Sequence, residues 1–155
     1  MILGNINNIR WEMVTPLSAG RLADRALVAG HEGHDGSPLW VIKAMQGREL
    51  VIGKFIPKYK QAFVPFDGKE VAVQNIEVLC AAPAYVRWVN ASNGSVPANA
   101  VPGGRSASGE VLYVGRAPHR NSLTPGKVHP SHGCIYISFG GLEHSIRNYE
   151  VLCTV

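Results

Sequence analysis

The sequence predicts an all-β protein made of two similar halves. Three observations support this fold class: short apolar stretches that alternate with smaller or polar residues, 17 glycines and 10 prolines dispersed along 155 residues, and a block of sequence that occurs twice. Dispersed glycine and proline indicate many turns between short elements. Hydrophobic residues make up 46% and charged residues 17%, a globular balance that provides a core. We therefore expect one compact globule.

The duplicated block places residues 66–80 over residues 139–153. These segments, FDGKEVAVQNIEVLC and FGGLEHSIRNYEVLC, end in the same EVLC and match at several other positions, 73 residues apart. The same offset places LWVIKA over LYVGRA and the dipeptide Gly53-Lys54 over Gly126-Lys127. Agreement of separate blocks on one offset indicates an internal repeat.

We predict two tandem repeats, residues 11–80 and 88–153, related by a pseudo-twofold axis. About 70 residues are too few for either repeat to be comfortably stable alone, so we expect their apolar faces to complete one another.

The expected strands follow the alternating and β-branched segments of each repeat. In chain order they are LWVIKA (39–44), IEVL (76–79), LYVGRA (112–117), CIYISF (134–139) and YEVL (149–152). Glycine-rich stretches such as GHEGHDGSP (30–38) and VPGGRSASGE (101–110) are expected to form turns. Helical periodicity is absent over any useful length.

Charge and cysteine content narrow the function classes. The formal charge is +4, but the 15 basic residues are scattered among 11 acidic ones, so we expect no nucleic acid partner. No window approaches the roughly 20 apolar residues of a membrane span, and the start, MILGNINNIRWEM, lacks the basic region and cleavage site of a signal peptide. With three cysteines and no evident leader, we expect a cytoplasmic or vesicle-associated protein, with unconventional secretion as the route outward.

The segment PGKVHPSHGC raises a choice between a metal site, a Cys/His nucleophile pair and plain packing. It contains His129, His132 and Cys134, and the equivalent segment of the first repeat, IGKFIPKYKQ, keeps none of them. A zinc site needs three or four converging ligands, and Cys134 begins an apolar strand. We favour packing and turn hydrogen bonds for the histidines and a small buried hydrophobe for the cysteine, and expect no metal and no cofactor. Cys80 and Cys153 are repeat equivalents and are also interpreted as packing residues.

Lys54 and Lys127 are the candidate ligand-binding cations. Each follows a glycine, and we place each in a loop that has just left a strand; the alternative is a surface lysine that protects a sheet edge. An acid in the upstream glycine-rich turn would place a carboxylate beside the ammonium. Charge-assisted hydrogen bonds from such a pair suit a small polyol or a sugar.

Other polar and aromatic residues have structural interpretations. Trp40 and Tyr113 occupy equivalent strand positions and could stack on a sugar, but a core role is favoured. Glu70 and Glu143 recur in the two repeats and are expected to make structural hydrogen bonds, because nothing pairs them as glycosidase carboxylates.

Long motifs of the second repeat resemble the DM-nine repeat. They are WVNASNGSVP (88–97), AVPGG (100–104), LYVGRAPH (112–119), SLTPGKVHPSHGC (122–134), FGGLEH (139–144) and NYEVL (148–152). The first repeat matches more loosely, so the resemblance covers essentially the whole chain. This family of invertebrate proteins also supplies the lectin-like N-terminal part of natterin-type toxins.

The resemblance implies a β-rich tandem fold intertwined by strand exchange, and calcium-independent binding of mannose. In the family, an acid of a Gly-Gly-x-Asp turn and the lysine of a Pro-Gly-Lys loop contact the sugar. Here the lysines match as Lys54 and Lys127, and Glu32 stands for the first acid. The second turn reads GGRS, so Arg105 is followed by Ser106 at the acid position, and a hydroxyl lacks the charged acceptor. We therefore expect Glu32 and Lys54 to form the competent site.

The resulting hypothesis is a non-enzymatic lectin for mannose or mannose-containing glycans in innate recognition of microbes, with a homodimer providing avidity. The alternative is an intracellular or vesicle-associated, infection-responsive adaptor with a degenerate sugar site. An enzyme ranks third, because it would need a metal at the histidine segment.

Overall fold

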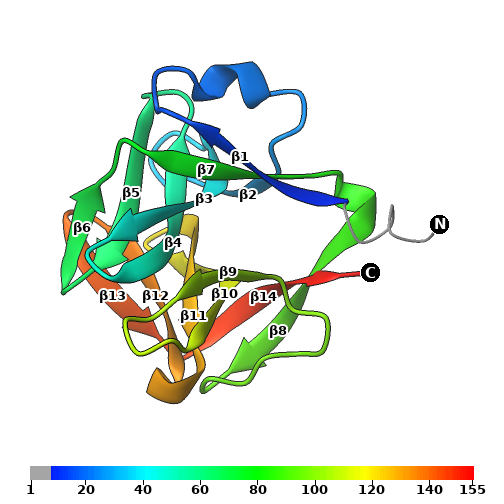
Figure 1. Cartoon of the computed structure of the whole chain (residues 1–155), viewed down its shortest axis with the longest axis vertical. Helices are drawn as coiled ribbons and strands as arrows, with labels where there is room; N and C mark the ends of the chain where they lie inside the picture. Colours follow the sequence, from blue (N-terminus) through cyan, green and yellow to red (C-terminus); the bar gives the residue numbers. More distant parts are fainter. Residues whose placement is uncertain (1–7) are drawn as a thin grey trace.

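The structure, a computed structural model, describes residues 8–155 and confirms the all-β prediction (Figure 1). The helical elements among these residues are three short 3₁₀ turns, η1 (Ala19–Leu22), η2 (Pro83–Tyr85) and η3 (Pro130–His132). No helix in this part of the chain is long and apolar enough to cross a membrane. Residues 1–7, most of the apolar start in which we expected no signal peptide, lie outside the described residues.

The strands divide into an N-terminal half, β1 to β7, and a C-terminal half, β8 to β14. The first half contains β1 (Ile9–Val14), β2 (Val28–His31), β3 (Pro38–Gln46), β4 (Glu49–Ile56), β5 (Gln61–Phe66), β6 (Lys69–Ala72) and β7 (Ile76–Ala81). The second contains β8 (Val86–Ser92), β9 (Pro102–Arg105), β10 (Val111–His119), β11 (Ser122–His129), β12 (Cys134–Phe139), β13 (Leu142–Ile146) and β14 (Asn148–Thr154). The five predicted strand segments lie within β3, β7, β10, β12 and β14.

All these strands belong to one hydrogen-bonded system, and eight of them close into a barrel. Strands β3, β2, β11, β12, β13, β6, β5 and β4 follow one another, and β3 pairs with β4 to complete the ring. Strands β7 and β1 extend from β3, while β9, β10, β14 and β8 continue from β4. The outermost strands of this order are therefore β1 and β8.

Three antiparallel pairings join the two halves. Strand β2 pairs with β11, β9 pairs with β4, and β6 pairs with β13. Figure 1 shows the last pair side by side, close to β5 and β12. The two halves consequently share one continuous network of backbone hydrogen bonds.

The placement of the two glycine–lysine dipeptides in loops was wrong. Lys54 lies inside β4 and Lys127 inside β11. The preceding glycines are required by close packing of the next strand: an added Cβ would lie 2.1 Å from Phe63 O at Gly53 and 2.1 Å from Tyr136 O at Gly126. A glycine that we interpreted as a turn residue therefore allows two backbones to approach.

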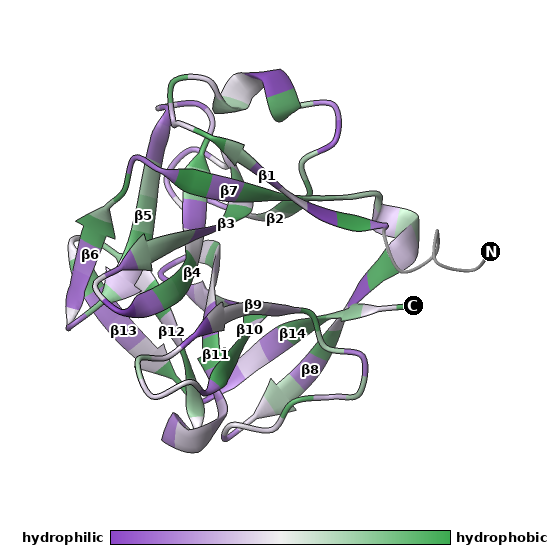
Figure 2. Ribbon diagram, in the orientation of Figure 1, coloured by the Kyte–Doolittle hydropathy of each residue, from purple (hydrophilic) through white to green (hydrophobic). Residues whose placement is uncertain are grey.

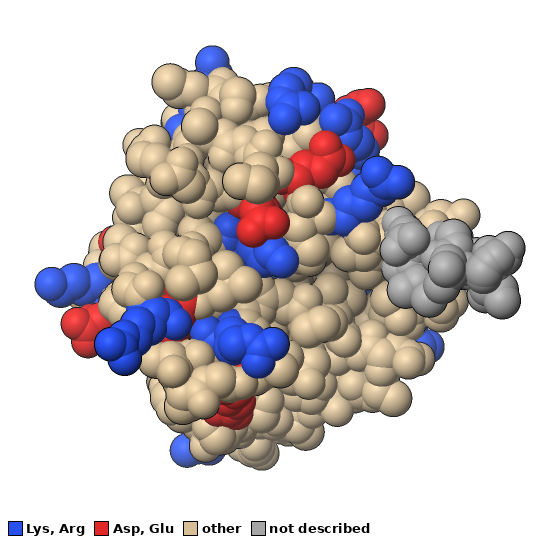
Figure 3. Space-filling view, in the orientation of Figure 1, with Lys and Arg blue, Asp and Glu red and all other residues tan. Residues whose placement is uncertain are grey.

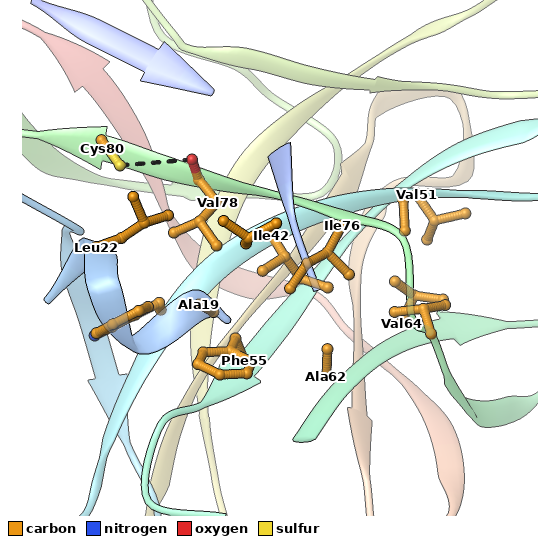
Figure 4. Close-up of a cluster of buried hydrophobic side chains, with 14 residues drawn as sticks. Ala19, Leu22, Ile42, Val51, Phe55, Ala62, Val64, Ile76, Val78 and Cys80 are labelled. Carbon is orange, nitrogen blue, oxygen red and sulfur yellow. Dashed lines mark hydrogen bonds between the residues drawn. The ribbon is translucent and has the colours of Figure 1, made fainter. Parts of the chain in front are cut away.

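The core is divided into clusters that share strands. In β3, Leu39, Trp40, Val41 and Ile42 are buried in succession, because Trp40 and Ile42 enter one cluster while Val41 enters another. Both faces of β3 are covered, so its burial does not alternate. Figure 4 shows the first cluster, to which η1 contributes Ala19 and Leu22, β3 contributes Ile42 and β4 contributes Phe55.

Polar and apolar residues are interspersed along the outer strands (Figure 2). On the face shown in Figure 3, basic side chains lie in small groups together with acidic ones. This distribution matches the scattered charges of the sequence.

Candidate functional site

Lys54 is a buried cation at the junction of the two halves. Its Nζ donates a hydrogen bond to Ser138 O at 2.8 Å, lies 3.1 Å from Glu70 Oε2 and lies 5.6 Å from the centroid of the Phe139 ring. The side chain is only 4% exposed. This burial excludes the alternative of a surface lysine that protects a sheet edge.

Glu70 is fixed in place by the β6–β13 junction. Its backbone N–H donates to Gly141 O at 3.0 Å, and its Oε1 accepts from Gly141 N at 3.1 Å. Glu143 repeats this pattern with Gly68, at 3.0 Å through its backbone and 2.8 Å through its carboxylate. The predicted structural hydrogen bonds of the two glutamates are confirmed. Pairing of each glutamate with a buried lysine was not predicted.

A pocket of about 420 Å³ opens beside Lys54. Glu32, Lys54 and Glu70 form its charged lining, and Tyr59, Phe63 and Phe139 supply aromatic surface. Glu32 and Lys54, predicted to share one site, thus line one pocket. Glu32 Oε1 is buried and has no hydrogen-bond partner.

The rim of the pocket is organised by Asp35, which lies in the glycine-rich turn. Ser37 donates its hydroxyl and its backbone N–H to Oδ1 at 2.7 and 2.9 Å. Tyr59 OH and Lys58 Nζ donate to Oδ2 at 2.7 and 3.0 Å. These hydrogen bonds, from Ser37 above all, hold the pKa of Asp35 far below its usual range. The network fastens the turn to the residues that follow β4 and places the Tyr59 ring at the pocket.

Lys127 occupies the corresponding place in the other half. Its Nζ lies 3.4 Å from Glu143 Oε2 and 3.4 Å from Glu49 Oε1. The rings of Tyr136 and Phe66 have their centroids 5.4 and 5.9 Å from Nζ. Its side chain is buried like that of Lys54, but two carboxylates face it instead of one carboxylate and one carbonyl.

The histidines of the PGKVHPSHGC segment pack beside Lys127. The His129 and His132 rings stack with centroids 3.5 Å apart, and His132 Nδ1 lies 2.9 Å from Tyr136 OH. Burial, followed by the neighbouring His132, lowers the pKa of His129. These contacts agree with the packing and turn hydrogen bonds that we predicted. Within residues 8–155, no group of three His, Cys, Asp or Glu side chains is arranged to hold a metal ion.

Glu110 ties the second glycine-rich turn to this segment. Its carboxylate accepts from Ser131 Oγ at 2.6 Å and from Ser131 N at 2.9 Å, and lies 3.4 Å from His129 Nδ1. The Ser131 hydroxyl is the main cause of a lowered pKa of Glu110. Glu110 was not predicted from the sequence, because at the offset of 73 it aligns with Ser37, while Asp35, the acid that fastens the first turn, aligns with Ser108.

Arg105 and Ser106 are engaged within their own turn. Ser106 Oγ lies 2.9 Å from Ser108 Oγ and accepts from Glu110 N at 3.0 Å. Arg105 Nη1 donates to Gly109 O at 3.0 Å, and its side chain lines another pocket, together with Lys43. The structure therefore assigns these two candidates a turn-forming role and does not group them with Lys127 as it groups Glu32 with Lys54.

The cysteines and Trp40 belong to the interior. Cys80, Cys134 and Cys153 are free and buried, and burial raises the pKa of Cys80 to about 11. Trp40 is buried against Phe55, with ring centroids 5.4 Å apart. The packing interpretation is confirmed for these four residues. Tyr113 is only partly buried and lines a pocket together with Lys43 and Arg105.

Glu70 and Phe139 are among the pocket residues that were not predicted from the sequence. One signal could have found them: each recurs 73 residues away, as Glu143 and Phe66, together with the lysines. A buried cation needs a buried anion, and the recurring glutamates were the matching candidates.

The chain is similar in sequence to two natterins. Natterin-3 of Thalassophryne nattereri is 39% identical over 67 residues, which cover 43% of this chain and 16% of natterin-3. Natterin-1 of the same organism is 28% identical over 102 residues, 64% of this chain and 27% of natterin-1. The chain thus corresponds to a minor part of each of these longer proteins.

Among solved structures, the nematode sperm cell motility protein MFP2B has a similar fold. The superposition has a TM-score of 0.59 at 17% identity and covers 84% of this chain and 40% of MFP2B. At the level of sequence families, the DM9 repeat matches residues 32–146, which include both buried lysines and their glutamate partners. The chain is a member of the DM9 repeat family.

Proposed function

We propose that this protein is a non-enzymatic carbohydrate-binding protein that holds its ligand in the Lys54 pocket. The observation that carries the proposal is the joint lining of this pocket by Glu32, the Lys54–Glu70 pair and aromatic rings. Carboxylates accept strong hydrogen bonds from hydroxyls, and aromatic faces pack against the apolar face of a sugar ring. The volume of about 420 Å³ suits a small ligand.

Mannose and mannose-containing glycans are the first ligands to test, as the family resemblance implies. We expect binding without calcium, because protein side chains supply the charged groups that would meet the hydroxyls.

The scaffold that we propose consists of two tandem repeats, residues 11–80 and 88–153, intertwined by exchange of strands. Reciprocal pairing supports it: β2 of the first half pairs with β11, and β9 of the second half pairs with β4. The matching Lys54–Glu70 and Lys127–Glu143 contacts support it as well.

The number of working sites should be one per chain. Beside Lys127, His132 and Tyr136 are hydrogen-bonded to each other. Ser106 occupies the position at which a second sugar site would need an acid. A homodimer would join two such sites and raise the avidity for a multivalent microbial surface. This arrangement would serve innate recognition.

Calorimetric titration with mannose and mannan, with calcium and with a chelator, tests the proposal. We expect saturable, chelator-resistant binding with a stoichiometry near one. Glu32→Gln should weaken it, while Glu110→Gln, a matched change in the other half, should leave it intact. Absence of binding to any sugar would favour the adaptor alternative. An equal loss of affinity in Glu32→Gln and Glu110→Gln would place the ligand outside the Lys54 pocket.

A further inference from the structure

The charges around the Lys54 pocket narrow the ligand class beyond a neutral sugar, and this inference rests on the proposed carbohydrate site. The charge of Lys54 is already paired inside the protein, because its ammonium contacts Glu70 Oε2 and Ser138 O. A buried, paired cation attracts an anionic ligand weakly. The pocket therefore has no free positive charge from Lys54 to offer.

The rim is balanced as well. Asp35 lies 3.0 Å from Lys58 Nζ and accepts hydrogen bonds from Ser37 and Tyr59. The Asp35 carboxylate and the Lys58 ammonium thus offset each other. Neither adds a net charge to the pocket mouth.

Glu32 is the uncompensated charge. Among residues 8–155 it makes no ion pair, and its Oε1 is buried without a hydrogen-bond partner, although the side chain lines the pocket. Glu70 Oε2 is likewise buried and lies outside hydrogen-bonding geometry despite its contact with Lys54. With His34 of the lining neutral, two carboxylates and one ammonium leave a net charge of about −1 in the pocket.

An unsatisfied carboxylate favours a ligand that brings donors and positive charge. The terminal torsion of a glutamate is broad, so a small rotation of Glu32 would direct an oxygen toward a bound group. An ammonium supplies three donors, and Tyr59 and Phe63 provide rings that a cation can approach.

We propose that the pocket prefers a hexosamine with a free, protonated amine over the neutral hexose, and rejects the corresponding uronic acid. Glu32 receives the amine, and the remaining hydroxyls meet the Lys54–Glu70 pair and the rim. An amine whose charge is removed by acetylation loses this advantage.

Titration of the whole chain with mannosamine, mannose, N-acetylmannosamine and mannuronate tests the preference. It is done at a pH at which the amine is protonated. We expect mannosamine to bind about tenfold or more tightly than mannose, the gain expected of one charge-assisted hydrogen bond. Mannuronate should bind most weakly, and Glu32→Gln should reduce the mannosamine advantage to about twofold or less. Glu110→Gln should leave the advantage unchanged.

The outcomes separate this inference from the proposed function. Equal affinity for mannose and mannosamine, or tighter binding of mannuronate, would overturn the amine preference and leave sugar binding in place. Binding of none of the four sugars would overturn both. A simple amine such as cyclohexylamine that binds as tightly as mannosamine would also overturn both, because the hydroxyls would then contribute nothing.

Discussion

The Lys54 and Lys127 regions begin from the same elements and end differently. Both lysines are buried in equivalent strands and contact equivalent glutamates, Glu70 and Glu143. Lys54 has a carbonyl as its second partner and a pocket beside it, whereas Lys127 has the second carboxylate of Glu49.

The difference originates in the residues around each lysine. Tyr59 turns toward Asp35 at the pocket rim, while His132, its equivalent 73 residues later, bonds to Tyr136 and stacks on His129. In one scaffold, a pocket thus lies beside Lys54 in one half, and a cluster of stacked and hydrogen-bonded rings lies beside Lys127 in the other. The ion pairs are shared by the two halves, and the residues around them differ.

Alanine at Gly53 or Gly126 should have the largest effect and tests whether the two halves are packed alike. Each added Cβ would meet a backbone oxygen at 2.1 Å. A backbone atom cannot move aside cheaply, so we expect a loss of about 3 kcal/mol or more in the free energy of unfolding, measured in urea. Gly20→Ala is the control: nothing lies within 4 Å, and the expected change is within about 0.5 kcal/mol. A tolerated Gly126→Ala beside a damaging Gly53→Ala would break the equivalence.

Replacement of each lysine by methionine should have an effect of similar size and measures the two ion pairs. Breaking a buried pair costs about 3–5 kcal/mol, because the partner charge stays buried. Lys127→Met should cost more than Lys54→Met, since Glu49 and Glu143 both lose their cation.

Neutralising the stranded carboxylate serves as the control for these variants. Addition of Glu143→Gln to Lys127→Met, or Glu70→Gln to Lys54→Met, should restore part of the stability in urea denaturation. If Lys54→Met lost more unfolding free energy than Lys127→Met, the second carboxylate beside Lys127, that of Glu49, would not contribute to stability.

Acidification should destabilise the protein through the cluster of His129, His132 and Tyr136, by less than the glycine and lysine substitutions do. Burial lowers the pKa of His129 below 6.5, its ordinary value, so the unfolded chain binds more protons in the window between the two values. Stability therefore rises with pH through this window and falls on acidification. Thermal unfolding at pH 7.5 and 5.5 should show a smaller acid-induced drop in Tm for His129→Ile, which copies Ile56 of the first half.

The exposed His31 provides the control. His31→Gln should keep the acid-induced drop of the parent protein, because the His31 side chain is exposed and forms no ion pair among the described residues. An unchanged drop in His129→Ile would assign the acid sensitivity to other groups, among them His119, whose pKa is also lowered by burial.

The smallest expected effects concern the acids that fasten the two glycine-rich turns. Tyr59→Phe removes a donor to Asp35, and Ser131→Ala removes a donor to Glu110. Amide hydrogen exchange should accelerate in residues 32–37 for the first variant and in residues 106–110 for the second. If a single variant accelerated amide exchange in both turns, the two regions would be coupled and not independent.

Much of the architecture was predictable because it depends on local pattern. Strands such as CIYISF and LYVGRA are evident from apolar alternation and β-branched content. The strand around Gly53-Lys54 was not predictable, because a glycine followed by a cation is typical of a turn. The glycine is required for another reason: the backbone of the adjacent strand approaches it closely at Phe63.

The candidate site was predictable only in part. Glu32 and Lys54 were identified from their turn and their repeated dipeptide, together with the family resemblance. Glu70, Tyr59 and Phe139 reach the same pocket from three other segments, and side-chain convergence of this kind leaves no local pattern in a sequence.

The sequence by itself determined the all-β class, the duplicated block and the residues that recur in both halves, because these depend on composition, periodicity and self-similarity. Only the tertiary structure decided that the lysines are buried, which glutamates they contact and that Lys54 lines a pocket. Those features depend on strand pairings such as β6–β13, which bring residues more than 70 positions apart into contact. The free energy of burying an ion pair is set by that three-dimensional surrounding and not by the neighbours of a residue in the chain.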